Sequence, residues 1–78
     1  MSIQITYAGY GVWENTRDAT TAIQQAYIRG QRKFLANNDW VGDPDSGERK
    51  YLYILWQSGG VNYSGVVGED DDRGVQVP

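Results

Sequence analysis

The first pattern along the chain is that of a β-strand. Ile3, Ile5 and Tyr7 alternate with polar residues, and a period of two is typical of a strand with one buried face. Two glycines interrupt this alternation within residues 8–11. The sequence therefore predicts a first strand that ends near residue 8, followed by a polar loop that runs through Arg17.

A short amphipathic helix is predicted next. Its apolar face is formed by residues at helical spacing, namely Ala19, Ala22, Ile23, Ala26 and Tyr27. Asp18 or Thr20 can cap its first turn by accepting a hydrogen bond from a free backbone N–H. Gly30 is a natural residue for its C-terminal end, so we expect about three turns.

The second half of the chain predicts strands separated by turns. Residues 33–36 form a short strand pattern, and residues 37–48 are a long loop made almost entirely of turn-forming residues. Residues 49–57 form the strongest strand pattern. Because both of its faces are apolar, we expect a central strand covered on both sides.

Glycines and acids mark the remaining turns. Ser58-Gly59-Gly60 predicts a tight hairpin, from which residues 61–67 return antiparallel. An acidic turn (residues 68–74) precedes a last short strand at residues 75–77. The sequence as a whole predicts a single α+β domain (residues 1–78), mostly β, with a small antiparallel sheet or sandwich of four to five strands and one short helix after the first strand.

Composition narrows the function. The chain has no Cys and no His, which excludes disulfides, thiolate zinc sites and histidine-based catalysis. Seven basic against ten acidic residues give a net charge of −3. That balance argues against nucleic acid and anionic membranes as partners. With no membrane-spanning run and no signal sequence visible, we expect a cytoplasmic, non-enzymatic binding protein without a metal or cofactor.

Ten aromatic residues, six Tyr, three Trp and one Phe, are many for 78 residues. Those on predicted strands and on the helix face are expected in the core: Tyr27, Phe34, Tyr51, Tyr53 and Trp56. Tyr10, Trp13 and Trp40 fall in predicted loops and need not be buried. Loop aromatics beside amides and carboxylates suit a sugar, because an indole stacks on a pyranose while polar groups pair with its hydroxyls.

The sequence therefore predicts lectin-like carbohydrate binding by loop residues, and the candidate ligand-binding residues are Trp13, Asn15, Asn37, Asn38, Asp39, Trp40 and Asp43. Three alternatives stay open. The same loop residues can simply build turns around an inward-facing Trp40. Asp43, Asp45 and Glu48, or residues 69–72, can bind a calcium ion. The aromatics can also bury against another protein chain, including a second copy in a homodimer.

The order of these signals resembles a known family. Tyr10-Gly11, Asp18-Ala19-Thr20, Gly42-Asp43-Pro44, Gly47 and Lys50-Tyr51-Leu52 are similar to the small β-rich domain at the C-terminus of a mitochondrial J-domain co-chaperone. That resemblance implies a β-rich fold and a non-enzymatic interaction role. It implies no chaperone ATPase stimulation, because the chain lacks the J domain and its His-Pro-Asp signature.

Overall fold

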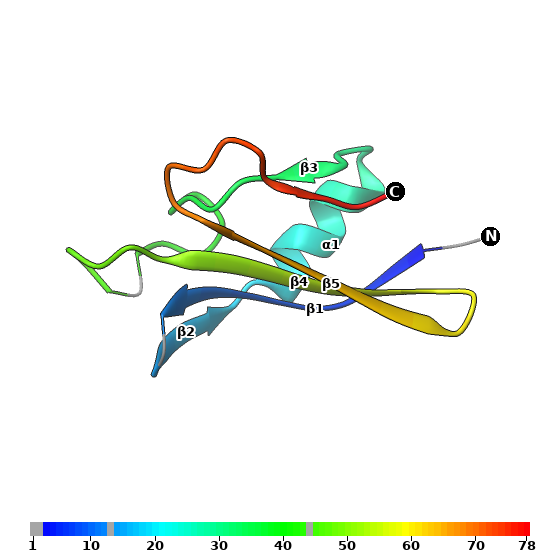
Figure 1. Ribbon diagram of the computed structural model, residues 1–78, viewed down its shortest axis with the longest axis horizontal. Helices are drawn as coiled ribbons and strands as arrows, with labels where there is room; N and C mark the ends of the chain where they lie inside the picture. Colours follow the sequence, from blue (N-terminus) through cyan, green and yellow to red (C-terminus); the bar gives the residue numbers. More distant parts are fainter. Residues whose placement is uncertain (1–2, 13, 44) are drawn as a thin grey trace.

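The computed structural model describes residues 3–12, 14–43 and 45–78. Within them the chain forms six strands and one helix, shown in Figure 1: β1 (Ile3–Val12), β2 (Asn15–Asp18), α1 (Thr20–Ile28), β3 (Lys33–Phe34), β4 (Tyr51–Ser58), β5 (Val61–Gly68) and β6 (Val75–Gln76). The predicted fold class is confirmed, because an antiparallel sheet dominates and a single short helix follows the N-terminal strand. No helix among the described residues is long and apolar enough to cross a membrane.

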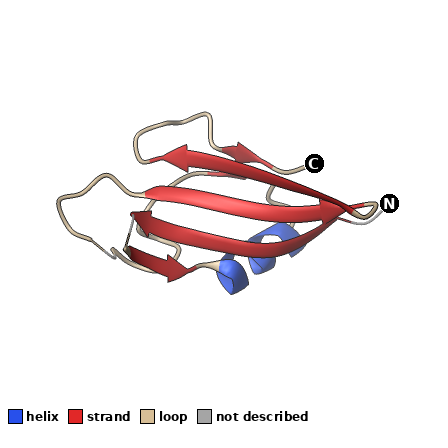
Figure 2. Ribbon diagram, turned by 60° about the horizontal axis from the view of Figure 1, so that its bottom comes forward, coloured by secondary structure: helices blue, strands red, loops and turns tan. Residues whose placement is uncertain are grey.

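Four strands form one antiparallel sheet in the order β2-β1-β4-β5, and β3 pairs with β6 in a separate two-stranded sheet. Helix α1 and the β3–β6 pair lie on one side of the four-stranded sheet (Figure 1). The opposite side, which we call the open face, carries no second layer formed by the described residues (Figure 2). The sheet is therefore covered on one side.

The core lies between the four-stranded sheet and this layer. Alternate β4 residues Leu52, Ile54 and Trp56 point into it, and Phe34 and Ile23 meet them from β3 and α1. Helix α1 contributes the predicted face, with Ala19 buried one residue before it begins. Asp18 Oδ1 accepts the Thr20 N–H at 2.8 Å, close to the predicted cap.

Two details of β1 differ from the sequence prediction. A bulge between Ile5 and Tyr7 shifts the register against β4, so Ile5 is buried whereas Tyr7 is 37% exposed on the open face. Beyond the bulge the strand continues to Val12 and pairs with β2. The predicted loop through Arg17 is therefore wrong: residues 15–18 form a strand, because Gly11 admits close approach of the β2 backbone.

The predicted burial of the aromatic residues is correct for some of them and wrong for others. Phe34 and Trp56 are in the core, and Tyr27 packs against it. Tyr10, which we placed in a loop, is fully buried within β1. Tyr51, which we expected to be buried, is 39% exposed because β4 is covered on one side only. β4 is an inner strand of the sheet, as expected, but the expectation that both of its faces are covered is wrong.

Candidate functional site

The predicted loop indole is used for packing. The Trp40 ring lies against Phe34, with centroids 6.0 Å apart. Its Nε1 donates a hydrogen bond of 2.7 Å to the carbonyl of Leu35. The side chain is half-buried and packs against the core. Trp40 therefore closes one end of the core, as in the turn-building alternative, whereas Trp13 lies outside the described residues.

The two loop asparagines are also engaged. Asn37 Oδ1 accepts the Asp39 backbone N–H at 2.9 Å, a local turn of the kind that Asn commonly makes. Asn38 Oδ1 accepts the buried Tyr10 hydroxyl at 2.7 Å. Both side-chain carbonyls thus hold the loop against the rest of the fold.

Asp43 belongs to an ion-pair cluster around Lys50. Lys50 Nζ lies 2.9 Å from Asp43 Oδ1 and 3.4 Å from Glu69 Oε1, and it donates to the Asp45 carbonyl at 3.1 Å. The hydrogen bond from Lys50 holds the pKa of Asp43 below its ordinary value. The backbone N–H of Lys50 does the same for the pKa of Glu69. Among the described residues no group of three or more acidic side chains is arranged to hold a metal ion.

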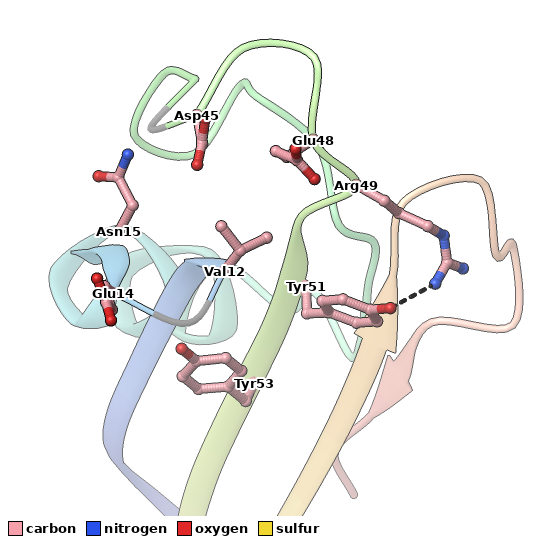
Figure 3. Close-up of a pocket in the computed structure, with 8 residues that line it drawn as sticks. All are labelled: Val12, Glu14, Asn15, Asp45, Glu48, Arg49, Tyr51 and Tyr53. Carbon is pink, nitrogen blue, oxygen red and sulfur yellow. Dashed lines mark hydrogen bonds between the residues drawn. The ribbon is translucent and has the colours of Figure 1, made fainter.

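A wide groove lies elsewhere, at the end of the open face between the β1–β2 hairpin and the loop before β4 (Figure 3). It has a volume of about 1230 Å³. Its lining residues are Val12, Glu14, Asn15, Asp45, Glu48, Arg49, Tyr51 and Tyr53. Among the predicted ligand-binding residues that the structure describes, Asn15 lines the groove, whereas Asn37, Asn38, Asp39, Trp40 and Asp43 do not.

Two tyrosines form one wall of this groove. Tyr51 and Tyr53 are two residues apart on β4, so their side chains leave the same face of the sheet (Figure 3). The Tyr53 hydroxyl lies 2.9 Å from Thr16 Oγ1 on β2. The Arg49 guanidinium lies 5.1 Å from the centre of the Tyr51 ring, and its Nη1 donates to the Tyr51 hydroxyl at 3.1 Å. Both rings are therefore held in place before any ligand arrives.

Gly9 makes room for these rings. It lies on β1 opposite Tyr53, and a Cβ at Gly9 would lie 2.8 Å from Cε2 of Tyr53 and 2.9 Å from the Tyr7 hydroxyl. Such distances are shorter than carbon contacts allow. The aromatic surface of the open face thus depends on the missing side chain of Gly9.

Four polar side chains of the groove have no partner among the described residues, in contrast to those of the loop. The carboxylates of Glu14, Asp45 and Glu48 and the amide of Asn15 make no hydrogen bond or ion pair with any described side chain or backbone group. Arg49 is anchored by its Nε, which donates to the Glu69 carbonyl at 3.0 Å. The groove therefore combines fixed aromatic rings with unpaired hydrogen-bonding groups.

Sequence reasoning missed the two tyrosines for one reason. The alternation of β4 correctly separates Tyr51 and Tyr53 from Leu52 and Ile54, but alternation does not say which side of a sheet is left uncovered. A single short helix, nine residues long in the structure, can cover only one face of a sheet. The prediction of one short helix therefore already indicated that the other face would be exposed.

Comparisons with known proteins add no family to this description: no protein-family model, no curated protein and no solved structure matches the chain.

Proposed function

We propose that this domain binds a saccharide in the groove on its open face. The observation that carries the proposal is the pair of immobilised tyrosines, Tyr51 and Tyr53, surrounded by carboxylate and amide groups without partners. A tyrosine ring can stack on the apolar face of a pyranose. Carboxylate, amide and guanidinium groups can pair with its hydroxyls.

The proposal keeps the class of ligand predicted from the sequence and moves the site. Asn15 stays a ligand-binding residue, and Tyr51 and Tyr53 replace Trp40 as the stacking surface. Asn38, Trp40 and Asp43 hold the scaffold through their own hydrogen bonds and ion pair. Three carboxylates against the single guanidinium of Arg49 give the groove a net negative charge. It therefore favours neutral saccharides over sulfated or sialylated ones.

Isothermal titration with a panel of neutral and anionic oligosaccharides, chosen from a glycan array, tests the proposal. Tyr51→Ala and Tyr53→Ala should each weaken binding about tenfold, since a stacked ring contributes about 1 kcal/mol or slightly more. Tyr51→Phe keeps the ring but loses the hydrogen bond from Arg49, so it should weaken binding less than Tyr51→Ala does. Leu55→Ala is the matched control, because Leu55 lies on the same face of β4 outside the groove.

Two results would contradict the proposal. One is a folded parent domain that responds to no saccharide on the array. The other is a saccharide whose affinity is unchanged in Tyr51→Ala and Tyr53→Ala but lost in Trp40→Phe, which would return the site to the loop.

One observation favours a second candidate, a protein-interaction module. Apolar surface continues along the open face beyond the groove, where Tyr7, Leu55 and Val66 are 37%, 40% and 65% exposed. A protein partner would bury these side chains, none of which lines the groove. Leu55→Glu with Val66→Glu should abolish co-purification of such a partner and leave saccharide titrations unchanged.

A further inference from the structure

The four-stranded sheet has two edges of opposite character. The β2 edge is four residues long and carries Arg17 and Asp18. The β5 edge is eight residues long, and its sequence, Val-Asn-Tyr-Ser-Gly-Val-Val-Gly, contains no charge and no proline. Short length, charge and proline are the usual means by which monomeric proteins prevent a free edge from pairing with another strand. The β2 edge has two of these protections, and β5 has none.

The β4–β5 hairpin defines which backbone groups of β5 face outward. Ser58 pairs with Val61 across a turn of two glycines, both with positive φ. In such a hairpin the pair that closes the turn is hydrogen-bonded, and hydrogen-bonded pairs then alternate with non-bonded pairs. The N–H and C=O groups of Asn62, Ser64 and Val66 therefore point away from β4. They bond to no other described backbone group outside the sheet.

This edge is also accessible and partly apolar. The hairpin tip extends beyond α1 and the β3–β6 pair, at the opposite end of the molecule from the groove (Figure 1). Val61, Tyr63 and Val66 are 51%, 46% and 65% exposed. The Tyr63 ring stacks on Trp56, with centroids 6.0 Å apart and an angle of 15° between the planes.

We propose that β5 is a dimerisation edge, on which β5 of a second copy of the chain pairs antiparallel around a two-fold axis at Ser64. Asn62 of one copy then lies opposite Val66 of the other, and Ser64 lies opposite Ser64. Each of these three pairs exchanges two backbone hydrogen bonds, about six in all. The product is a continuous eight-stranded sheet, and the interface is isologous, as in most protein dimers.

Charge supports a second copy in this register. The acidic turn that follows β5, Glu69 to Asp72, would repel its counterpart at close range. In the proposed register residue 69 of one copy lies beside residue 59 of the other, next to the uncharged Gly59-Gly60 turn. The two acidic turns are then separated along the strand by ten residues, about 33 Å, which is well beyond the screening length of about 8 Å at physiological salt.

The two-fold symmetry has a consequence for saccharide binding. This consequence rests on the proposed saccharide site, whereas the dimer proposal does not depend on that site. A two-fold axis perpendicular to an antiparallel strand pair turns both open faces to the same side. Two grooves would then face one surface that displays several copies of a glycan, and avidity would exceed the affinity of either groove.

Sedimentation velocity of the whole chain from about 1 μM to about 1 mM tests the dimer. The parent chain should shift from monomer to dimer with concentration. Ser64→Lys and Ser64→Glu should each remain monomeric, because each places like charges opposite one another at the axis. An equimolar mixture of the two should recover a dimer. Ser64→Thr should dimerise like the parent, and Thr21→Lys, which makes the same charge change on α1, should also dimerise.

Each other outcome overturns the proposal. A parent chain that is monomeric at every concentration shows that the β5 edge does not pair with itself, whether or not the groove binds sugar. A dimer that persists in Ser64→Lys places the interface elsewhere. Failure of the mixture to dimerise rejects the register. Far-UV circular dichroism of each variant separates a lost dimer from a lost fold, and saccharide titration of monomeric Ser64→Lys tests the groove independently.

Discussion

The ammonium of Lys50 lies 2.9 Å from Oδ1 of Asp43, and the Lys50 side chain is 5% exposed. The same ammonium contacts the Asp45 carbonyl and Glu69, so it joins the loop before β4 to the acidic turn after β5. The upper wall of the groove, which includes Asp45 and Glu48, is held to the sheet through this lysine.

Acid should therefore destabilise the domain through these contacts. Asp43 and Glu69 have folded-state pKa values below the 3.8 and 4.5 expected for unfolded chains. Because the unfolded chain takes up protons first, the stabilisation is fully present above about pH 4.5 and is lost as pH falls through the lowered values. Asp71 accepts a hydrogen bond from the Arg73 side chain, which lowers the pKa of Asp71 to about 2. The stabilisation contributed by Asp71 is therefore lost only as the pH falls towards 2.

Thermal melts between pH 7 and pH 2 should show this loss directly. Lys50→Met should lower the melting temperature at pH 7, because Asp43 no longer has its cation. The melting temperature of this variant should also change less between pH 5 and pH 3 than that of the parent chain. Lys33→Met is the control, since Lys33 is exposed and forms no ion pair with described residues. Equal acid slopes for the parent and Lys50→Met would show that the cluster does not contribute.

Tyr10 should ionise only at high pH. Burial, followed by the charge and hydrogen bond of Glu69, raises the pKa of its hydroxyl above the ordinary value of 10.0. The stabilisation is present below pH 10 and is lost as pH rises towards the raised value. In an alkaline titration followed by phenolate absorbance, we expect a late phase that is coupled to unfolding. That phase should be absent from Tyr10→Phe and unchanged in Tyr63→Phe.

Gly9→Ala and Gly11→Ala should have different effects although the two glycines are two residues apart on β1. A Cβ at Gly11 would collide with the backbone carbonyl of Asn15, which cannot move without breaking the β1–β2 pairing. We expect a loss of about 1–3 kcal/mol in the free energy of unfolding.

Gly9→Ala displaces the half-exposed Tyr53 and Tyr7 side chains instead of backbone. It should lower unfolding free energy by less than Gly11→Ala and weaken saccharide binding by more than Leu55→Ala does. Urea unfolding and isothermal titration on the same samples measure both effects. Unfolding free energies that fall equally in the two variants would contradict the distinction.

Trp40→Phe should affect stability alone. The substitution keeps an aromatic ring against Phe34 but removes the hydrogen bond to the Leu35 carbonyl. The expected loss is about 0.5–1.5 kcal/mol in unfolding free energy. Saccharide affinity should stay within a factor of two of the parent chain, whereas a large loss in the folded variant would assign the ligand to the loop.

Local pattern was sufficient for much of the fold. The helix, the Gly59-Gly60 hairpin and the alternation of β4 all follow from short-range spacing, and each is present. Tyr10 was misplaced because the glycines on either side resemble a loop. In the strand they admit close neighbours on the open face, and Tyr10 points into the core between them.

The groove was beyond the reach of such patterns because its parts are distant in sequence. Val12, Glu14 and Asn15 meet residues 45–53 there because β1 pairs with β4, which places Gly11 opposite Tyr51. The Asn- and Asp-rich loop gave a stronger local signal, yet turn chemistry accounts for most of it: Asn37 closes a turn, and Asp43 Oδ1 accepts the Asp45 N–H at 3.1 Å.

The residue at position 9 also distinguishes two kinds of related sequence. A chain with a larger residue at this position could keep the same strands, core and lysine cluster, because none of them depends on an empty site at Gly9. It could not keep the rings of Tyr7 and Tyr53 where they now lie. The identity of this one residue should therefore separate relatives that retain the aromatic surface from those that retain only the scaffold.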